Sequence, residues 1–232
     1  KFWAMGSEEL GALTTDGGIA LGTDGIGFLS TTGVTALKTD AVAALTTDQI
    51  VALTSSQIAA LKTSQVAALT SDQVAAIETA DIKALGTAAI VALSTSDFAA
   101  ITTSQIGALT SAQVAAIETR DIVVLSTDQF LAMGTTQIMA LSTAQMSALT
   151  TDQVIALGAD VGALSTSAFA SLNTSAVAAL STLQIASLTS AQTGALKTAQ
   201  AAALTTDQVR AFENADLAAL STAAIVALRT DA

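Results

Sequence analysis

The sequence predicts an all-α fold: a solenoid of very short helices, with one helix in each eight-residue repeat. Three observations support this prediction. An apolar anchor residue recurs every eight residues from Leu13 to Leu157 and again from Leu164 to Leu228. Threonine or serine, which is favoured at the start of a helix, occupies one fixed place in almost every unit. Aspartate often follows that hydroxyl residue, where the positive end of the helix dipole favours an anion.

The period of eight excludes the two simplest regular structures. In one continuous helix, eight residues rotate by about 800°, so the anchors would spiral around the axis and form no face. In a plain strand, the first and sixth positions of the repeat would point to opposite sides. One short helix per octad avoids both problems. Because so short a helix is unstable alone in water, each octad must pack against its neighbours.

Numbering each octad from its anchor gives a consistent pattern. Position 1 is Leu, position 3 is Thr or Ser, position 5 is usually Gln, position 6 is Ile or Val, and position 8 is Ala. We place the N-cap at position 3 and the helix from position 4 to the next octad's position 1, for example Asp48 to Leu53. Positions 1, 5, 6 and 8 of such a helix face inward, and positions 4 and 7 face outward.

Position 2 carries residues that suit the end of the preceding helix. Cations are favoured near a helix C-terminus, and they occur at position 2 as Lys38, Lys62, Lys197 and Arg229. Glycine readily takes the left-handed conformation that often ends a helix, and it occurs at position 2 as Gly22, Gly86, Gly134 and Gly158.

A β-solenoid with about three octads per coil stays open as an alternative. Thr at position 3 and Ile or Val at position 6 would suit strands. The high alanine content and the placement of charges favour helices. The number of octads in a helical coil, and its handedness, do not follow from the sequence.

The chain divides into a leader and two regions of repeats. We interpret residues 1–7 as a leader that derives from cloning. Residues 8–36 are glycine-rich, less regular N-terminal repeats, in which Ile19 is one place out of register. Residues 37–232 form a continuous octapeptide-repeat solenoid with one seven-residue unit, "LGADVGAL", at 157–164. We interpret that unit as a tightened turn without its Thr cap, and the whole chain as a segment of a longer array.

The composition disfavours catalysis and several classes of partner. The chain has 232 residues, 51% of them hydrophobic, with no Cys and no His. Disulfides, thiolate chemistry and histidine-based catalysis are therefore excluded. A net charge of −11 with scattered basic residues disfavours nucleic acid. No apolar run approaches the roughly 18 residues that cross a bilayer. We expect no enzyme activity, no cofactor and no catalytic, cofactor-binding or metal-ligating residues.

Glutamine at position 5 is the most regular polar feature of the inward face. A buried amide needs hydrogen-bond partners, so we predict that these side chains bond to free backbone groups at adjacent helix ends and form a ladder. A bound ligand is the alternative. The residues are Gln49, Gln57, Gln65, Gln73, Gln105, Gln113, Gln129, Gln137, Gln145, Gln153 and Gln208.

Two further patterns have a structural and a functional interpretation. The row of position-3 hydroxyls predicts helix caps, with an ice-binding face as the alternative. Three octads pair Glu with an Asp three residues later, which predicts helix N-termini, with half of a Ca²⁺ site as the alternative. These pairs are Glu78/Asp81, Glu118/Asp121 and Glu213/Asp216.

The stretch "LTTDQIVAL" resembles the opening helix of a TAL-effector repeat over about nine residues, without that family's 34-residue period or basic character. The whole chain from Leu13 more closely resembles Leu-Thr-Thr-Asp-Gln-Ile-Ala-Ala octapeptide arrays of large repetitive bacterial surface or secreted, adhesin-like proteins. That resemblance implies a non-catalytic stalk or spacer that is secreted or on the cell surface. The alternative is a protein- or glycan-binding module that uses one solenoid face. Expected contacts are neighbouring repeats of the chain and end-to-end self-association.

Overall fold

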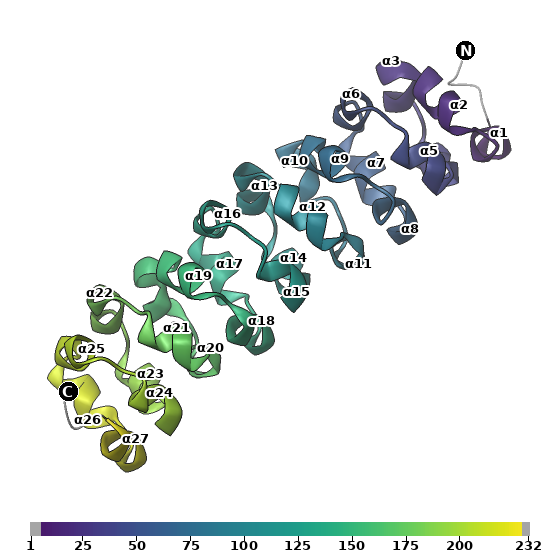
Figure 1. The fold of residues 1–232 in the computed structure, drawn as a ribbon. Coiled ribbons are helices and arrows are strands. Elements are labelled where there is room, and N and C mark those ends of the chain that lie inside the picture. Colours follow the sequence, from purple (N-terminus) through teal and green to yellow (C-terminus); the bar gives the residue numbers. More distant parts are fainter. Residues whose placement is uncertain (1–5, 229–232) are drawn as a thin grey trace. The chain divides into compact units, whose positions relative to one another are not determined.

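The computed structural model describes residues 6–228 of the chain, which divides into two compact units, residues 1–124 and 125–232. Every element in the described residues is a helix of four to six residues, and none of them is a strand. The all-α prediction is confirmed, and the β-solenoid alternative is wrong. Figure 1 shows the short helices in chain order.

The first unit contains fifteen helices: α1 (Ser7–Gly11), α2 (Thr15–Ala20), α3 (Gly22–Gly27), α4 (Thr31–Ala36), α5 (Thr39–Ala43), α6 (Thr47–Val51), α7 (Ser55–Ala60), α8 (Thr63–Val66), α9 (Ser71–Ala76), α10 (Thr79–Ile82), α11 (Thr87–Ala92), α12 (Thr95–Ala100), α13 (Thr103–Ala108), α14 (Ser111–Ala116) and α15 (Thr119–Ile122) among its described residues. The described part of the second unit contains α16 (Thr127–Leu131), α17 (Thr135–Met139), α18 (Thr143–Ala148), α19 (Thr151–Ala156), the 3-10 helix η2 (Gly158–Ala163), α20 (Thr166–Ser171), α21 (Thr174–Ala178), α22 (Thr182–Ala186), α23 (Ser190–Gly194), α24 (Thr198–Ala202), α25 (Thr206–Ala211), α26 (Asn214–Ala219) and α27 (Thr222–Ala227).

Three consecutive octads make one coil of the solenoid. In the first unit α2 packs on α5, α4 on α7, and α9 on α12. In the second unit α20 packs on α23, α23 on α26, and α24 on α27. Each helix therefore stacks on the helix three octads later, and each unit consists of three stacks of helices around a shared core. The coil number that the sequence left open is three octads, which is one coil for every 24 residues in the regular stretches.

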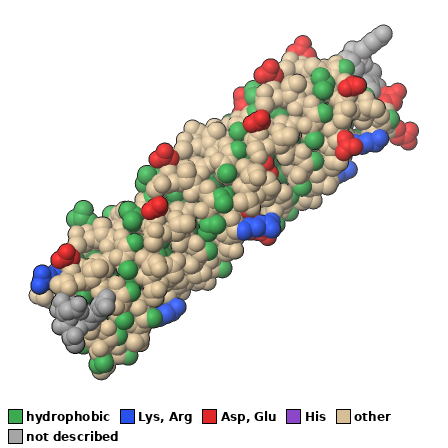
Figure 2. All heavy atoms as spheres, in the orientation of Figure 1, with side chains coloured by type: hydrophobic (Ala, Val, Ile, Leu, Met, Phe, Trp, Pro, Cys, Tyr) green, Lys and Arg blue, Asp and Glu red, His purple; other side chains and the backbone are tan. Residues whose placement is uncertain are grey.

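The core lies between the three stacks and is built from positions 1 and 6. Ile50 at position 6 is 2% exposed and Leu53 at position 1 is 4% exposed, whereas Val51 at position 7 is 44% exposed. Burying each such Ile or Leu favours folding by about 1.5–3 kcal/mol relative to leaving it exposed. The predicted faces are confirmed for the inward positions 1, 5 and 6 and for the outward positions 4 and 7, whereas position 8, such as Ala52, is only half-buried. In Figure 2 the hydrophobic side chains on the visible face occur mostly as small separate groups.

The helices begin one position earlier than the sequence predicted. The helix expected from Asp48 to Leu53 runs from Thr47 to Val51, and its N-cap is Thr46 at position 2. Thr47, the predicted cap at position 3, is the first helical residue. The prediction failed because the N-cap was assigned to position 3, where the hydroxyl residue is nearly invariant. Position 2, which is mixed in sequence, holds the cap. Lys38, Lys62 and Lys197 are consequently N-caps of the following helices, and one or two residues separate each from the end of the preceding helix. Arg229 lies outside the described residues.

Only two of the four position-2 glycines are left-handed. Gly22 has a φ of 65° and Gly158 a φ of 53°, as predicted for the end of a helix. Gly86 and Gly134 instead have φ values of −67° and −79° and serve as extended N-caps. The prediction is wrong for this second pair, because position 2 there begins a helix after an extended corner.

The octad register reaches further towards the N-terminus than predicted. Ser7 begins α1, and Leu10, which is 2% exposed, occupies position 6 of an octad that contains it. Ser7 is therefore part of the first coil, while residues 1–5 of the predicted leader lie outside the described residues. The glycine-rich repeats also belong to the first unit, because α2, α3 and α4 pack on α5, α6 and α7.

The seven-residue unit at 157–164 still forms a helix. It is the 3-10 helix η2, which keeps Val161 fully buried and packs on α17 and α22. A 3-10 helix rises about 2.0 Å per residue where an α-helix rises about 1.5 Å, so seven residues cover nearly the length of an octad. The missing Thr cap was predicted correctly, whereas the interpretation as a turn is wrong.

Candidate functional site

Glutamine at position 5 closes a local hydrogen-bonded ring at the start of most helices. The backbone N–H of Gln57 donates to Thr54 Oγ1 at 3.3 Å, and the Thr54 N–H donates to Gln57 Oε1 at 2.7 Å. This reciprocal arrangement is a capping box, which satisfies two backbone donors that the helix itself leaves free. Position 5 is the third residue of the helix, so one side chain can reach the cap and still face the core.

The same glutamine uses its amide nitrogen to reach the coil before it. Gln57 Nε2 donates to the Ile26 carbonyl at 2.9 Å and to the Leu29 carbonyl at 2.8 Å. These acceptors lie 31 and 28 residues earlier: Ile26 is in the last turn of α3, and Leu29 is in the corner that follows it. The identical pair of separations recurs for Gln65, Gln73, Gln105, Gln113, Gln192 and Gln208.

The predicted amide ladder is therefore confirmed for these glutamines, whose amide nitrogens bond carbonyls of the preceding coil. Every glutamine at position 5 in the described residues is between 1% and 7% exposed. Burying an amide is costly unless its donors and acceptor are bonded. Here Oε1 holds the cap of its own helix, and Nε2 bonds carbonyls that a helix C-terminus leaves free. Each rung thus fixes the register between two coils.

The sequence reasoning missed three members of the ladder. Gln184, Gln192 and Gln200 also occupy position 5 and make the same capping box and inter-coil bonds. They lie after the seven-residue unit, where the octad count restarts at Leu164. The register from Leu164 already places all three at position 5, together with Gln208, so the sequence carried the signal that identifies them. Gln129, Gln137 and Gln145 bond the cap residues of their own helices, as the others do.

The ladder adjusts where the repeat is irregular. Across the seven-residue unit, Gln184 Nε2 reaches the Val154 carbonyl at 2.9 Å over 30 residues, one fewer than elsewhere. In the octad before Gln184, position 5 is Ala176 and has no amide. The N-cap residue of the same helix, Asn173, supplies an amide instead. Asn173 Nδ2 donates to the Leu149 carbonyl at 3.2 Å, while Asn173 Oδ1 accepts the Ala176 N–H at 2.8 Å. An amide therefore still links these two coils.

Aspartate at position 5 makes a second kind of rung. Asp97 Oδ1 accepts the Ser71 hydroxyl at 2.9 Å, and its Oδ2 accepts the Ser94 N–H at 2.8 Å. Asp121 and Asp216 accept the hydroxyls of Thr95 and Ser190 at 2.6 Å. Asp81 accepts that of Ser55. In all four cases the donor is the position-3 residue of the octad 26 residues earlier. Carboxylates accept but do not donate, so the direction of the bond between coils is reversed.

The paired acids lie at helix N-termini, as predicted. Glu78, Glu118 and Glu213 are N-caps, and the Asp of each pair is the third helical residue. Arg120 forms an ion pair with Glu118 and lies 3.6 Å from the fully buried Asp121. Among the described residues, no group of three or more Asp or Glu side chains gathers in an arrangement that could hold a metal ion.

The position-3 hydroxyl row is not accounted for by capping. Caps use position 2, so most position-3 hydroxyls lie on the outer surface, apart from those that donate to aspartate. The capping explanation of this row is wrong for that reason. The ice-binding alternative stays a prediction, which a measurement of thermal hysteresis tests.

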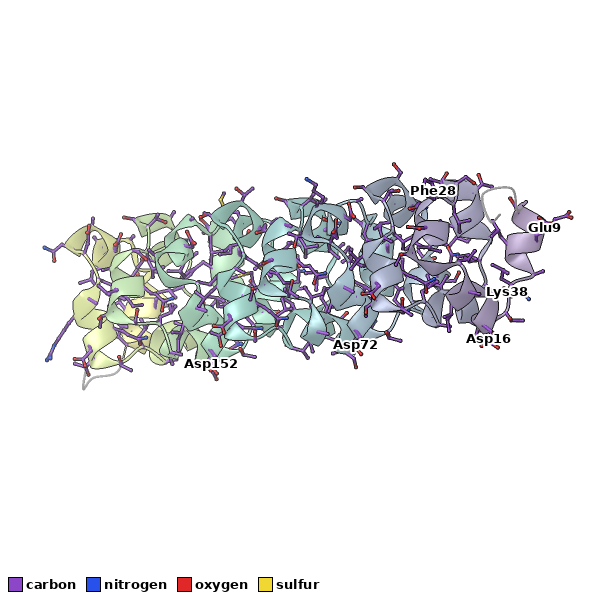
Figure 3. All side chains as sticks on the ribbon, turned by 90° about the horizontal axis from the view of Figure 1, so that it is seen from above. Glu9, Asp16, Phe28, Lys38, Asp72 and Asp152 are labelled. Carbon is purple, nitrogen blue, oxygen red and sulfur yellow. The ribbon has the colours of Figure 1, made fainter. Side chains whose placement is uncertain are left out.

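The outer surface carries charged and apolar side chains away from the core. In Figure 3 Glu9, Asp16, Phe28, Lys38 and Asp72 of the first unit point outward. In the part of the chain that the structure describes, no helix is long and apolar enough to cross a membrane.

Comparison with known proteins finds one family. A family model described as the ALTTAQ repeat matches residues 19–55, 51–76, 74–111, 114–151, 127–159 and 158–190. The matched segments together cover more than half of the 232 residues. No curated protein matches the chain.

Proposed function

Because the chain belongs to the ALTTAQ repeat family, we propose that it is a non-catalytic structural scaffold, a stalk or spacer segment of a large repetitive bacterial protein. The observation that carries this proposal is the ladder between coils. The amide of Gln105 bonds the Val74 and Ile77 carbonyls of the preceding coil, and equivalent bonds recur through each unit. The buried glutamine amides therefore bond neighbouring coils to each other.

A spacer of this kind works through its geometry. Each coil contacts the coils directly before and after it, so its stability is close to a sum of local terms, as in other solenoids. The acceptors of the amides are backbone carbonyls, which every octad supplies whatever its sequence. Coils can therefore be added or removed without redesigning their neighbours, and the number of coils sets the reach.

A location on the cell surface or outside the cell is part of the same proposal. It rests on the resemblance to octapeptide arrays of repetitive bacterial adhesin-like proteins. The absence of cysteine is compatible with it, because the fold then needs no particular redox environment. An antibody against the repeat tests this location. It should bind intact cells or detect the parent protein in the medium, and detection only after the cells are lysed would contradict the proposal.

The spacer proposal is tested by removing whole coils. Deleting 24 residues, such as 46–69 in the first unit or 189–212 in the second, removes three octads and rejoins the chain in register. A spacer predicts the same loss of maximum dimension in small-angle X-ray scattering for either deletion, with both variants folded. Deletion of residues 46–65 is the matched control, because 20 residues break the octad register and should disturb folding. Unequal losses between the two in-register variants would argue against a uniform spacer.

A second candidate function, a binding module, is favoured by one surface feature. Leu131 and Ile155 are 60% and 48% exposed and occupy position 7 of the stacked helices α16 and α19. Two large apolar side chains at equivalent places in adjacent coils favour contact with a protein partner. Replacing both with Ser should abolish capture of such a partner, whereas replacing Val91 of the first unit with Ser should not. A pure spacer is indifferent to all three changes.

A further inference from the structure

One contact between successive coils of the first unit has no glutamine amide. The helices α10, α11 and α12 stack on α7, α8 and α9, and their position-5 residues are Asp81, Ala89 and Asp97. In the coil before them, α7, α8 and α9, all three position-5 residues are glutamines that bond the preceding coil. We call the contact between α7–α9 and α10–α12 the seam.

The carbonyl groups that amides would reach at the seam have no hydrogen-bond donor. The separation of 28 residues found for the glutamine rungs identifies them as the carbonyls of Leu53, Leu61 and Leu69. All three leucines are buried. Among the described residues, no hydrogen bond to these three oxygens is found. A buried carbonyl without a donor lowers stability, so the seam lacks stabilising bonds that the preceding contact has.

Two hydroxyl bonds and the core hold the seam together. Asp81 accepts the Ser55 hydroxyl, and Asp97 accepts the Ser71 hydroxyl at 2.9 Å. The methyl group of Ala89 makes no hydrogen bond. The position-6 side chains of all six helices at the seam are at most 1% exposed, so the core continues through it. The seam therefore differs from the preceding contact in its polar bonds and not in the burial of its core.

Every other coil contact in the described part of the first unit has at least one amide rung. Gln49 joins α4–α6 to α1–α3, and Gln105 and Gln113 join α13–α15 to α10–α12. In the second unit, the coil of η2, α20 and α21 also lacks glutamine at position 5, but there the Asn173 amide bonds the Leu149 carbonyl. The seam is thus the contact in the described first unit that has lost every amide.

We propose that the seam is the place where the first unit opens first, before any of its other coil contacts separates. In a solenoid each coil contacts only its neighbours, so the stability of each contact depends on its local bonds. Parts of a folded protein open separately, and those with the fewest stabilising contacts open most often. Opening here exposes the core-facing side chains of α7–α9 and α10–α12. This inference does not depend on the spacer role; in a spacer it fixes where the array extends under load.

The absence of cysteine from the chain allows thiol labelling to measure this opening. Val66 and Val114 are fully buried position-6 residues of α8 and α14, and both of these helices pack on α11. The seam lies between α8 and α11, whereas two amide rungs join the coil of α14 to that of α11. The single variants Val66→Cys and Val114→Cys therefore form a matched pair. The cysteine at the seam should react with a thiol reagent at least about tenfold faster.

Restoring the amides at the seam is the decisive change. The variant D81Q/A89Q/D97Q places glutamine where other octads have it, so it should fold and gain three rungs. It should slow the labelling of Val66→Cys at least about tenfold and that of Val114→Cys by less. The control D81A/D97A removes the same two charges without adding an amide and should not slow the labelling of Val66→Cys. Equal labelling of the two cysteines in the natural background, or equal slowing of both by the glutamines, overturns the proposal.

A reverse change decides the question if the glutamine variant does not fold. The substitutions Q105A/Q113A remove the amide rungs between α13–α15 and α10–α12. They should raise the labelling rate of Val114→Cys to about that of Val66→Cys, because the two contacts of α11 then both lack amides. An unchanged rate for Val114→Cys overturns the proposal.

Discussion

Gln57 and Leu29 join two successive coils through a single hydrogen bond, in which the Gln57 amide donates to the Leu29 carbonyl at 2.8 Å. The two residues are 28 positions apart, yet both are at most 7% exposed. The Leu29 carbonyl belongs to the corner that follows α3, where no later turn of helix provides a donor. The glutamine thus satisfies a backbone group that the short helices of this fold leave free at each corner.

Removing one amide rung should destabilise the fold measurably. Gln57→Ala leaves the Ile26 and Leu29 carbonyls without the amide and the Thr54 N–H without its acceptor, so we expect a loss of about 1–3 kcal/mol in the free energy of unfolding. Ser56→Ala, an exposed change at the adjacent residue, is the matched control and should stay within about 0.5 kcal/mol. Urea denaturation followed by circular dichroism measures both. Equal effects would refute the role of the rung.

The position of the N-cap can be tested with two adjacent threonines. Thr46→Ala removes the hydroxyl that accepts the Gln49 N–H at 3.2 Å and should cost about 1 kcal/mol. Thr47→Ala alters an exposed first-turn residue and should have little effect. The comparison uses the denaturation midpoint of each variant. A larger loss at Thr47 would restore the cap to position 3.

The aspartate rungs predict coupling between residues far apart in sequence. The Ser71 hydroxyl donates to Asp97 in the next coil at 2.9 Å. The effects of Ser71→Ala and Asp97→Ala on the free energy of unfolding should therefore not be additive. A double-mutant cycle should give a coupling energy of about 0.5–3 kcal/mol. Pairing Asp97→Ala with Ser56→Ala provides a control cycle without a shared bond, for which we expect additivity.

Gly162 in η2 is predicted to be intolerant of any side chain. A Cβ there would lie 2.2 Å from the Ser187 carbonyl oxygen of the next coil, so Gly162→Ala must push two backbones apart. Overpacking of this kind costs about 1–3 kcal/mol or more. Gly134→Ser is the control, because that glycine is an extended N-cap whose nearest neighbour to a Cβ is 3.8 Å away, at the end of the Gln137 side chain. The control should unfold at an unchanged or slightly higher temperature.

Thr193 offers a prediction of increased stability. It occupies position 6, where other octads have Ile or Val, and its buried hydroxyl has no hydrogen-bond partner among the described residues. Thr193→Val keeps the shape and removes the unsatisfied group, so we expect a gain of about 1 kcal/mol. Thr205→Val should have the opposite effect, because Thr205 Oγ1 accepts the Gln208 N–H at 3.2 Å. A loss of stability in Thr193→Val would show that its hydroxyl has a partner.

Much of the fold can be predicted from the repeat, because the burial of each position follows directly from its pattern. The inward positions, the short helices and the ladder of Gln57 and its equivalents all follow from the placement of apolar and amide groups. The N-cap could also have been found. Thr46 and Gln49 are three residues apart, which is the spacing of a capping box. The cap was predicted at Thr47 because position 3 is almost invariant. Thr46, the residue before it, has the glutamine partner that a capping box requires.

Other features depend on contacts that no local pattern contains. Three octads per coil follows from how corners between helices turn, and eight-residue units alone do not encode that angle. The reversed bond from Ser71 to Asp97 needs the same information, since the two residues are 26 positions apart. The replacement of one amide by Asn173 could be recognised only once Leu149 was placed beside it.

Nuclear magnetic resonance of the side-chain amides can show whether glutamine joins each coil to the coil before it. For Gln65 we expect slow exchange of the Nε2 hydrogens with water and scalar coupling across hydrogen bonds to the Val34 and Leu37 carbonyls, which are both within 3 Å. Exchange as fast as that of an exposed glutamine, or coupling to carbonyls of its own octad, would show that Gln65 does not join the two coils.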